Sequence, residues 1–376
     1  MKNPTWIEIS KDALLQNISE IKKLLKKKAK KKTRFIAVVK SNAYGHGLLQ
    51  VAGAIKNKID AFGVYDFEDA LLLRAQKIDK PILMLGRVFV NQIELATKEQ
   101  IEVSVSNLDI LRAAKKLSGN QKLKIHLCVE TGLGRDGFVF DCVKKVLPLL
   151  KNKNIELVGL YTHFAAPDSS TFLDYTKAQV LEFLKWKNAL AKIGLNPQLH
   201  ASSTAGTFIS EINCIFDAVR VGGGIYGLWS SDEVFEKYQK ETKLVAALSW
   251  KTKVVEIKNL PKGSFISYGC TFQLKRDSKI AILPVGYFDG IPRISSKKAW
   301  VLVNGIKVPQ LGRVTMNMIV VDVTDVKKIK VGDIATIIGG EKNQVVSAED
   351  WGDWSGSFNY EITTRINPNL TRKLIS

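Results

Sequence analysis

The sequence predicts an α/β protein with an N-terminal (β/α)8 barrel and a C-terminal domain made mainly of β-strands. Up to about residue 222, short β-branched apolar runs alternate with helical patterns, which is typical of a parallel sheet built from βα units. Beyond residue 228 the runs are shorter and turn signals separate them. The chain has 376 residues, 45% of them hydrophobic, which is enough for one large domain and a smaller one.

The first predicted element is an amphipathic helix that ends in a run of lysines. Its apolar face is formed by Leu14, Leu15, Ile18, Ile21, Leu24 and Leu25. The lysines at positions 26–28 and 30–32 fall on its solvated side and at its C-terminus, where the helix dipole favours cations. A formal net charge of +20 could instead indicate nucleic-acid binding, but no aromatic residues are interleaved with these lysines to stack on bases. We therefore expect no nucleic-acid partner.

Eight apolar runs follow, each with the length and composition of a buried strand. They cover residues 35–39, 61–65, 81–85, 101–105, 123–129, 156–162, 198–201 and 216–221. Eight strands with intervening helices fit a closed barrel, and an open doubly wound sheet remains compatible with the same count.

The second domain is predicted from turn signals. A helical stretch around residues 233–242 leads to Pro261-Lys262-Gly263, Asn304-Gly305, Val331-Gly332-Asp333 and Gly339-Gly340. Asn-Gly is a hairpin signal, and this spacing suits a compact β domain. We expect residues 1–242 to form the barrel and residues 243–376 the β domain, with residues 1–9 left open to pairing with the second domain.

Cysteine usage and hydropathy indicate the compartment. Cys128, Cys142, Cys214 and Cys270 are widely spaced, have no CxxC spacing and lie in apolar stretches, which predicts reduced, buried thiols with neither a disulfide nor a metal site. The N-terminus has no apolar run typical of a signal peptide, and no stretch is long enough to span a bilayer. We expect a cytoplasmic location.

Polar residues stand at the carboxyl ends of several predicted strands, where a barrel of this kind carries its working residues. Lys40 follows the first strand, Arg135 the fifth, His163 ends the sixth and Arg220 ends the eighth. A lysine at the end of an apolar strand is costly unless its charge is neutralised or paired. Covalent attachment to an aldehyde cofactor would neutralise it in part and give it a function.

The loops after the seventh and eighth strands predict an anion site. Ser202 and Ser203 follow the seventh strand, and the eighth runs into three glycines at residues 222–224, so hydroxyls and free backbone N–H groups are available for a phosphate. Each feature has an ordinary alternative: a glycine loop, a serine helix cap, or a structural role for His163. Their common position at one rim favours the functional interpretation.

At residues 37–47 the sequence AVVKSNAYGHG is similar to the cofactor-lysine signature of the alanine racemases, which use pyridoxal 5′-phosphate (PLP) and have fold type III. Further similar segments follow in the order of that family: ETGLGR at 130–135, YTHFA at 161–165, HASS at 200–203, VR at 219–220, SYG at 267–269, PVGYFDG at 284–290, GRVTMN at 312–317 and NYE at 359–361. The resemblance covers nearly the whole chain.

The resemblance implies a two-base racemisation of L- and D-alanine, which supplies D-alanine for peptidoglycan, by a homodimer with shared active sites. It implies that Lys40 carries PLP and is one base, and that Tyr268, from a partner subunit, is the other. The remaining implied roles are phosphate binding by Tyr44, Ser203, Tyr360 and the backbone of Gly222 and Gly223; contact with the pyridine nitrogen by Arg220; substrate carboxylate binding by Arg135 and the backbone of Met316; and the entrance at Tyr287. We expect His163 among the cofactor-binding residues. Because a tyrosine that acts as a base near pH 7 needs its phenolate stabilised, His163 and Arg220 are the candidates for that role.

The sequence departs from the family pattern in three respects. Cys128 stands where the family commonly has a carbamylated lysine that orients the equivalent of Arg135; Thr315 and Asn317 stand where a cysteine and an aspartate are usual; and Ser202 is often asparagine. Alternatives therefore stay open: a racemase for serine, lysine or a broad set of amino acids, a PLP-dependent decarboxylase of related fold, or a PLP-binding protein without catalysis. Proteins of the last kind usually lack a second domain, which argues against it.

Overall fold

The computed structural model of the chain describes residues 4–376 except residues 30, 119–120, 209–211 and 213. Its contacts define two compact units that are interleaved in sequence. The barrel unit comprises Leu14–Ser41 and Val51–Val245, and the β-rich unit comprises Met1–Ala13, Asn42–Gln50 and Ala246–Ser376. Two short N-terminal segments thus group with the C-terminal part of the chain, and the division into domains after residue 242 stays a prediction.

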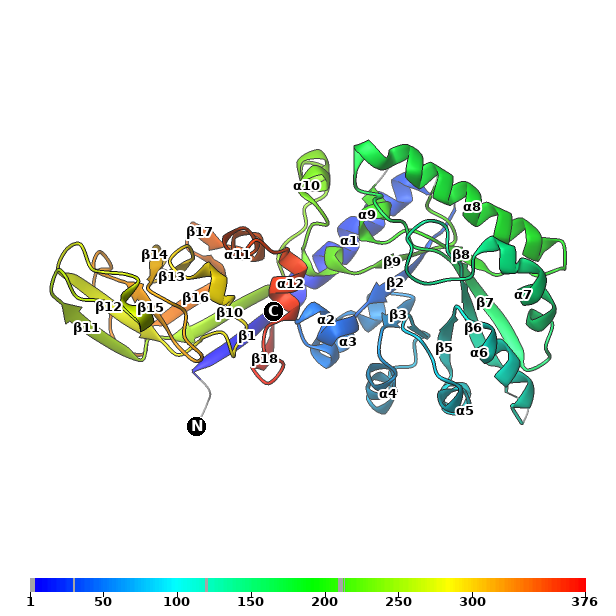
Figure 1. Ribbon diagram of the computed structural model, residues 1–376, viewed down its shortest axis with the longest axis horizontal. Helices are drawn as coiled ribbons and strands as arrows, with labels where there is room; N and C mark the ends of the chain where they lie inside the picture. The colour runs from blue at the N-terminus through cyan, green and yellow to red at the C-terminus, as the bar shows by residue number, and fades with distance from the viewer. Residues whose placement is uncertain (1–3, 30, 119–120, 209–211, 213) are drawn as a thin grey trace. The chain divides into compact units, whose positions relative to one another are not determined.

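Eight parallel strands close into a barrel in the order β2 to β9 (Figure 1). The strands are β2 (Arg34–Val38), β3 (Ala61–Val64), β4 (Ile82–Met84), β5 (Ile101–Val105), β6 (Leu123–Cys128), β7 (Ile155–Tyr161), β8 (Gln198–His200) and β9 (Ala218–Val221). Each of the eight predicted runs overlaps one of them. Because β2 and β9 pair with each other, the barrel is confirmed and the open sheet is excluded.

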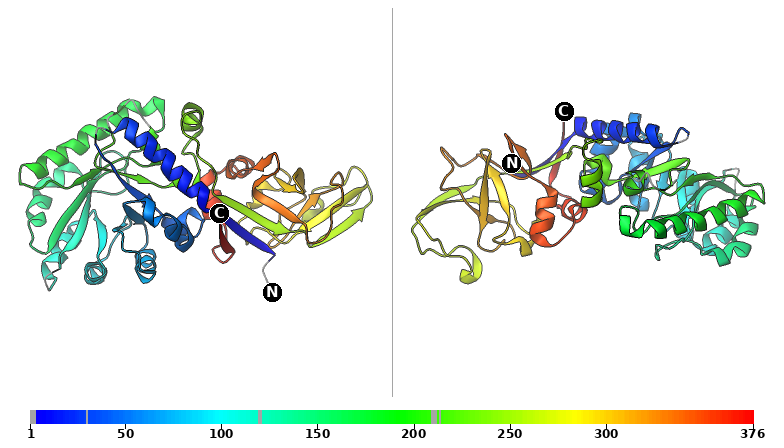
Figure 2. Two further views of the ribbon diagram at one scale, coloured as in Figure 1. Left: turned by 180° about the vertical axis from the view of Figure 1, so that it is seen from behind. Right: turned by 90° about the horizontal axis from the view of Figure 1, so that it is seen from above.

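Helices lie outside the barrel strands, and the two longest, α1 and α8, are seen clearly from behind in Figure 2. The helices up to residue 245 are α1 (Lys11–Lys28), α2 (Lys40–Tyr44), α3 (Leu48–Ile55), α4 (Phe67–Ala75), α5 (Ile93–Lys98), α6 (Leu108–Ala113), α7 (Val143–Leu150), α8 (Leu173–Ala191), α9 (Thr204–Phe208) and α10 (Asp232–Tyr238). Strands β3, β4 and β5 are buried at every position, because helices cover one face and the barrel interior the other. This is why β3 and β4 appear in the sequence as continuous apolar runs, whereas β5 also contains the buried polar residues Glu102 and Ser104.

Helix α1 has the predicted amphipathic character. All six predicted apolar residues except Leu15 are buried. The prediction that the lysines are solvated is wrong for Lys28, whose amine donates to the carbonyl of Phe208 and lies 4.6 Å from the ring centroid of Tyr238. Lys31 forms an ion pair with Asp217, and Lys30 lies outside the described residues.

The β-rich unit contains one ten-stranded sheet. Its order is β11-β12-β15-β14-β13-β16-β10-β1-β18, with β17 paired to β16. The elements are β1 (Thr5–Ser10), β10 (Leu248–Lys253), β11 (Glu256–Leu260), β12 (Ser278–Leu283), β13 (Trp300–Val303), β14 (Ile306–Leu311), β15 (Ile319–Asp322), β16 (Ile334–Glu341), β17 (Gln344–Val346), α11 (Ala348–Ser355), α12 (Asn359–Thr364) and β18 (Thr371–Ile375). Strand β1 lies inside the sheet, antiparallel to β10 and parallel to β18. Of residues 1–9, whose pairing was left open, residues 1–3 lie outside the described part.

The Asn304-Gly305 hairpin is confirmed. Strands β13 and β14 pair in antiparallel register up to Val303↔Ile306, which leaves two residues in the turn. Asn304 has φ +53° and Gly305 has φ +78°, as a type I′ turn requires at both central positions.

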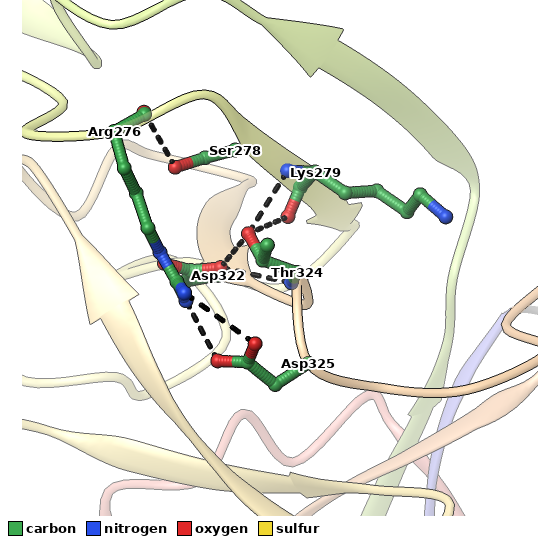
Figure 3. A network of polar contacts seen from close by, with 6 residues as sticks. All are labelled: Arg276, Ser278, Lys279, Asp322, Thr324 and Asp325. Atoms are coloured by element: carbon green, nitrogen blue, oxygen red, sulfur yellow. Dashed lines mark hydrogen bonds and ion pairs between the residues drawn. The ribbon is translucent and has the colours of Figure 1, made fainter.

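A polar network extends the pairing of β12 and β15 beyond their last paired residues (Figure 3). The backbone N–H of Lys279 donates to Thr324 Oγ1 over 3.0 Å, and the Thr324 hydroxyl donates to Asp322 Oδ1 over 2.6 Å. Arg276 Nη2 donates to Asp325 Oδ2 over 2.6 Å. Because both members of this ion pair are well exposed, we expect the network to act mainly by fixing the turn after β15.

The cysteines are free thiols that differ in burial. Cys128 and Cys214 are buried and Cys142 is half-buried, but Cys270 is exposed, so the expectation of a buried thiol is wrong at that position. Cys270 lies in the 3-10 turn η7 (Tyr268–Cys270). Among the helices of the described residues, none combines the length and apolarity needed to cross a membrane.

Candidate active site

The segment after Lys40 is a left-handed helical turn. Helix α2 has φ values of +55°, +54°, +52° and +54° at Ser41, Asn42, Ala43 and Tyr44. Left-handed helical backbone costs roughly 1–2 kcal/mol per residue in the absence of glycine, so this turn is strained. The sequence signature contains these residues, but propensity alone gives no sign of the left-handed conformation.

Contacts within the β-rich unit hold the end of this turn. Leu48 N–H donates to Asn42 Oδ1 over 2.9 Å, and Arg372 Nε donates to the carbonyl of Gly45 over 2.8 Å. A Cβ at Gly45 would lie 1.9 Å from the carbonyl oxygen of Thr363, so only glycine fits there. These contacts therefore hold the turn in its left-handed conformation despite the backbone strain.

Lys40 has the properties of a reactive amine. Burial lowers its pKa, and the positive charge of Arg135 lowers that pKa further. Among the described residues, no carboxylate pairs with its Nζ. The charged form of this amine is thus disfavoured by its position in the barrel unit.

Arg220 lies buried at the end of β9 and is held by acceptors on the neighbouring strand ends. Nη1 donates to Nδ1 and to the carbonyl of His200, over 2.7 Å and 2.9 Å. Nη2 donates to the carbonyls of Thr162 and Ala201, over 2.6 Å and 3.0 Å, and to Nδ1 of His163 over 3.2 Å. Burial lowers the pKa of Arg220 to about 10, so the guanidinium stays protonated at pH 7. Its Nε–H makes no hydrogen bond within the described part of the chain and is available to a ligand.

His163 is neutral at pH 7. Burial lowers its pKa to about 3, with further lowering by the charges of Arg220, Arg135 and Lys40. Because its Nδ1 accepts from Arg220, its remaining proton is on Nε2. His163 therefore offers one N–H donor from the same cluster that contains Lys40, Arg135 and Arg220.

The predicted phosphate site is partly engaged by the protein. The Gly222 N–H donates to Thr204 Oγ1 over 3.0 Å, whereas Gly223 begins the 3-10 turn η6 (Gly223–Tyr226), so its N–H has no acceptor within that turn. The carbonyl of Ser203 accepts from Thr207 N–H. Gly223 N–H and the Ser203 hydroxyl are the donors most available to an anion here.

The loop that carries Arg135 is organised by Glu130. The Glu130 carboxylate accepts hydrogen bonds from the four backbone N–H groups of residues 132–135. Burial alone would raise the pKa of Glu130, but these four donors outweigh it and the pKa is lowered. The Arg135 side chain is 63% exposed and pairs with Asp136 at 3.4 Å. Burial raises the pKa of Cys128 to about 11, so its thiol stays neutral and supplies no charge for Arg135.

The β-rich unit holds the other predicted site residues. Tyr268, Tyr287 and Met316 line one pocket of about 330 Å³ together with Arg293, Arg313, Val314, Thr315, Asn317 and Met318. Tyr268 is 73% exposed. The carbonyl of Met316 accepts from Phe288 N–H over 3.0 Å, whereas the Met316 N–H makes no hydrogen bond within the described residues. Thr315, one of the departures from the family pattern, donates through its hydroxyl to the Met318 carbonyl and so holds this turn.

Tyr44 and Tyr360 form an edge-to-face pair with ring centroids 5.4 Å apart in the β-rich unit. Burial raises the pKa of Tyr44 to about 12, so its hydroxyl keeps its proton. The predicted residues therefore form two groups, one in each unit. Sequence reasoning missed three others: Glu102, His126 and His200 are buried polar residues of the barrel strands. A buried charge in an apolar strand was the available signal for Glu102.

Comparisons with known proteins agree along the whole chain. The family model described as "Alanine racemase, N-terminal domain" matches residues 9–230, and "Alanine racemase, C-terminal domain" matches residues 247–374. Alanine racemase of Methanococcus maripaludis is 34% identical, covering 99% of both chains, and alanine racemase 1 of Caldanaerobacter subterraneus is 36% identical, covering 98% of this chain and 94% of that protein.

Solved structures show the same similarity. The crystal structure of alanine racemase from Bacillus anthracis with bound L-Ala-P has a TM-score of 0.91 and 32% identity, covering 100% of this chain and 96% of that one. Alanine racemase from D-cycloserine-producing Streptomyces lavendulae has a TM-score of 0.90 and 28% identity, covering 100% and 98%.

Proposed function

Because the chain belongs to the alanine racemase family, we propose that it interconverts L-alanine and D-alanine with bound PLP, with Lys40 and Tyr268 as the two bases. The observation that carries the proposal is the state of Lys40, a partly buried amine whose pKa is lowered by burial and by Arg135. An amine that releases its proton more readily is a better nucleophile towards an aldehyde and a better acceptor of a proton from carbon.

The donors of the barrel unit suit the cofactor. Arg220 offers Nε–H to a ring nitrogen, and Ser203 and Gly223 offer O–H and N–H to a phosphate. When bound, PLP supplies an aldehyde for the lysine and a ring that delocalises the electron pair left by the α-proton. Because Arg220 keeps its proton at pH 7, it would donate a hydrogen bond to the ring nitrogen without transferring the proton, and this keeps the electron sink weak. Tyr44, which also keeps its proton, is a further donor for the phosphate.

Two bases on opposite faces of the α-carbon are what inversion requires, because one must remove the proton and the other must return it. Lys40 would serve one face. Tyr268 can serve the other once its phenolate is stabilised, for which the Nε2–H of His163 is a suitable donor. Arg135 and the Met316 N–H would hold the substrate carboxylate, with Tyr287 at the entrance.

We propose a homodimer in which each site combines the barrel unit of one subunit with the β-rich unit of the other. The strong exposure of Tyr268, in a pocket that also contains the Met316 and Tyr287 side chains, supports this arrangement. A cytoplasmic location and supply of D-alanine to peptidoglycan complete the proposal.

The first test is D-alanine formation from L-alanine by the purified protein with PLP, beside Tyr268→Phe and with L-serine and L-lysine as competitors. Racemisation that is lost in the variant supports both the reaction and the second base. Turnover of serine or lysine without alanine would replace the substrate, and bound PLP without any racemisation would favour a non-catalytic PLP-binding protein.

Shared sites are tested by mixing two inactive variants, Lys40→Ala and Tyr268→Phe, under conditions that exchange subunits. A mixed dimer would contain one site with both wild-type bases, so random exchange should restore about one quarter of wild-type activity. If each site were built within one subunit, every site would lack a base and no activity would return.

A further inference from the structure

Four buried side chains on different barrel strands form one continuous line of hydrogen bonds. Glu102 (β5) contacts His126 (β6) through Oε2 and Nε2, 2.8 Å apart. His126 Nδ1 lies 2.8 Å from Nε2 of His200 (β8), and His200 Nδ1 lies 2.7 Å from Nη1 of Arg220 (β9). Each of the four residues is less than 10% exposed.

The order of donors along this line follows from Arg220. A guanidinium has only donors, so His200 Nδ1 must accept and the His200 proton must be on Nε2. That proton is donated to His126 Nδ1, which must therefore accept, so the His126 proton is on Nε2 and is donated to Glu102. Both imidazoles are then neutral, because a proton on His126 Nδ1 would force His200 to turn an N–H towards Arg220.

The line joins a buried cation to a buried carboxylate. Among the described residues no carboxylate contacts Arg220, and its acceptors are carbonyl oxygens and imidazole nitrogens. Burial alone would raise the pKa of Glu102, but the hydrogen bond from His126 and the charges of Arg34 and Lys124 lower it overall. Glu102 is therefore ionised, and aligned neutral imidazoles between opposite charges polarise one another in the favourable direction.

Tyr161 keeps His200 in place for this role. The rings of Tyr161 and His200 are stacked, with centroids 5.0 Å apart and planes at 8°. The Tyr161 hydroxyl is hydrogen-bonded to Ser104 Oγ over 2.5 Å, so the stacking ring is itself anchored. Rotation of the His200 ring would break both of its hydrogen bonds within the line.

We propose that Glu102, His126 and His200 form a positioning relay that fixes the orientation of Arg220 and compensates its buried charge, so that its Nε–H points to the cofactor ring nitrogen. The last step rests on the proposed function. The three relay residues act through Arg220 and do not themselves touch substrate or cofactor.

The tautomers give a test that does not depend on activity. The chain has four histidines, so a holoenzyme labelled with 15N-histidine gives a simple spectrum, which can be assigned with His126→Gln and His200→Gln. We expect His126 and His200 each to carry one proton, on Nε2, as the order of donors along the line requires. A proton on Nδ1 of either ring in the wild-type holoenzyme would overturn the proposal.

The functional arm compares Glu102→Gln with Glu94→Gln, an exposed position on α5. A carboxylate can only accept a hydrogen bond from His126, whereas the glutamine amide of this variant can either accept or donate one. The direction of the hydrogen bonds along the line is then no longer fixed. We expect a shift of the His200 nitrogen signals, a changed absorption spectrum of the bound cofactor, and a kcat reduced ~10-fold with KM little changed, whereas Glu94→Gln should match wild type. Equal behaviour of the two variants in spectra and kinetics would refute the relay. A wild-type enzyme without racemisation would instead refute the proposed function, and the tautomer result would still decide the relay.

Discussion

Three of the four histidines lie in surroundings that disfavour their charged form. Burial lowers the pKa of His46 to about 4 and that of His163 to about 3, and it lowers the pKa of His200 well below its usual value. An unfolded histidine has a pKa of about 6.5 and binds a proton below that pH. The folded protein therefore binds fewer protons than the unfolded chain in mildly acidic solution.

This difference predicts the pH dependence of stability. Where the unfolded state binds more protons, the free energy of unfolding rises with pH, so stability is fully present above about pH 6.5 and declines as pH falls towards 4. Urea unfolding of the cofactor-free protein between pH 5 and 7 measures this slope, and His163→Gln should reduce it by about one proton. A midpoint that is constant over this range would contradict the assigned burial.

The four backbone hydrogen bonds accepted by Glu130 predict that this residue affects substrate affinity. Glu130→Gln replaces an acceptor of four N–H bonds by an amide with one acceptor oxygen, so the Arg135 loop should lose its fixed shape. We expect KM for alanine to rise ~10-fold with a smaller change in kcat. Steady-state kinetics beside Glu156→Gln, an exposed control, provide the measurement. If both variants keep the wild-type KM, Glu130 does not organise the binding loop.

At the scale of elements, the left-handed turn after Lys40 is the segment that sequence propensity explains least. Strands β3 and β4 were predictable because burial on both faces leaves continuous apolar runs. The β13–β14 turn was predictable because Asn-Gly suits positive φ at both positions. No glycine stands at residues 41–44, so nothing local favours left-handed backbone there. Distant contacts, such as that of Arg372 with Gly45, determine it.

Ser41 allows the strain of this turn to be measured, because its side chain is exposed and its φ is +55°. Ser41→Gly should stabilise the protein by about 1 kcal/mol, and Ser41→Val should destabilise it by a similar or larger amount, since a β-branched residue fits left-handed backbone poorly. Thermal unfolding of the two variants tests this order. The reverse order, with valine more stable than glycine, would exclude a left-handed conformation at this position.

The hairpin turn gives a matched pair of glycine substitutions. Gly305→Ala places a Cβ at φ +78° and 2.6 Å from the Lys342 side chain, so a loss of about 1 kcal/mol is expected. At Gly340 the nearest atoms to an added Cβ are 3.7 Å away, and Gly340→Ala should change the unfolding free energy little. A similar loss in both variants, measured by denaturant unfolding, would count against the type I′ turn.

At the scale of the whole molecule, each compact unit is built from segments that are far apart in the sequence. The sequence predicted the barrel and the β-strand character of the C-terminal part. The roles of the site residues stay predictions, and Tyr44, which was expected in the barrel, groups with the β-rich unit. The sequence left open whether β1 joins the sheet, and it did not reveal the segment at residues 42–50 or the buried relay. The relay contacts join residues 24 and 74 positions apart, and such distant pairs leave no periodicity or spacing to detect.

The interior position of β1 predicts that the C-terminal part cannot form its sheet alone. A fragment of residues 246–376 would lack the strand that separates β10 from β18. We expect this fragment to show little cooperative unfolding by circular dichroism, and a peptide of residues 1–13 to restore part of it. Independent folding of the fragment to the same stability as the full chain would contradict the role of β1.

The contact between Arg372 and Gly45 also orders events during synthesis. Strand β18 leaves the ribosome after every other described element, yet its arginine binds the backbone five residues beyond Lys40. A nascent chain that has completed its barrel strands therefore still lacks the Arg372 contact that holds the strained turn after Lys40. A chain that terminates before β18 would contain all the strands of the barrel. It would lack the hydrogen bond from Arg372 to Gly45 that holds the segment after Lys40.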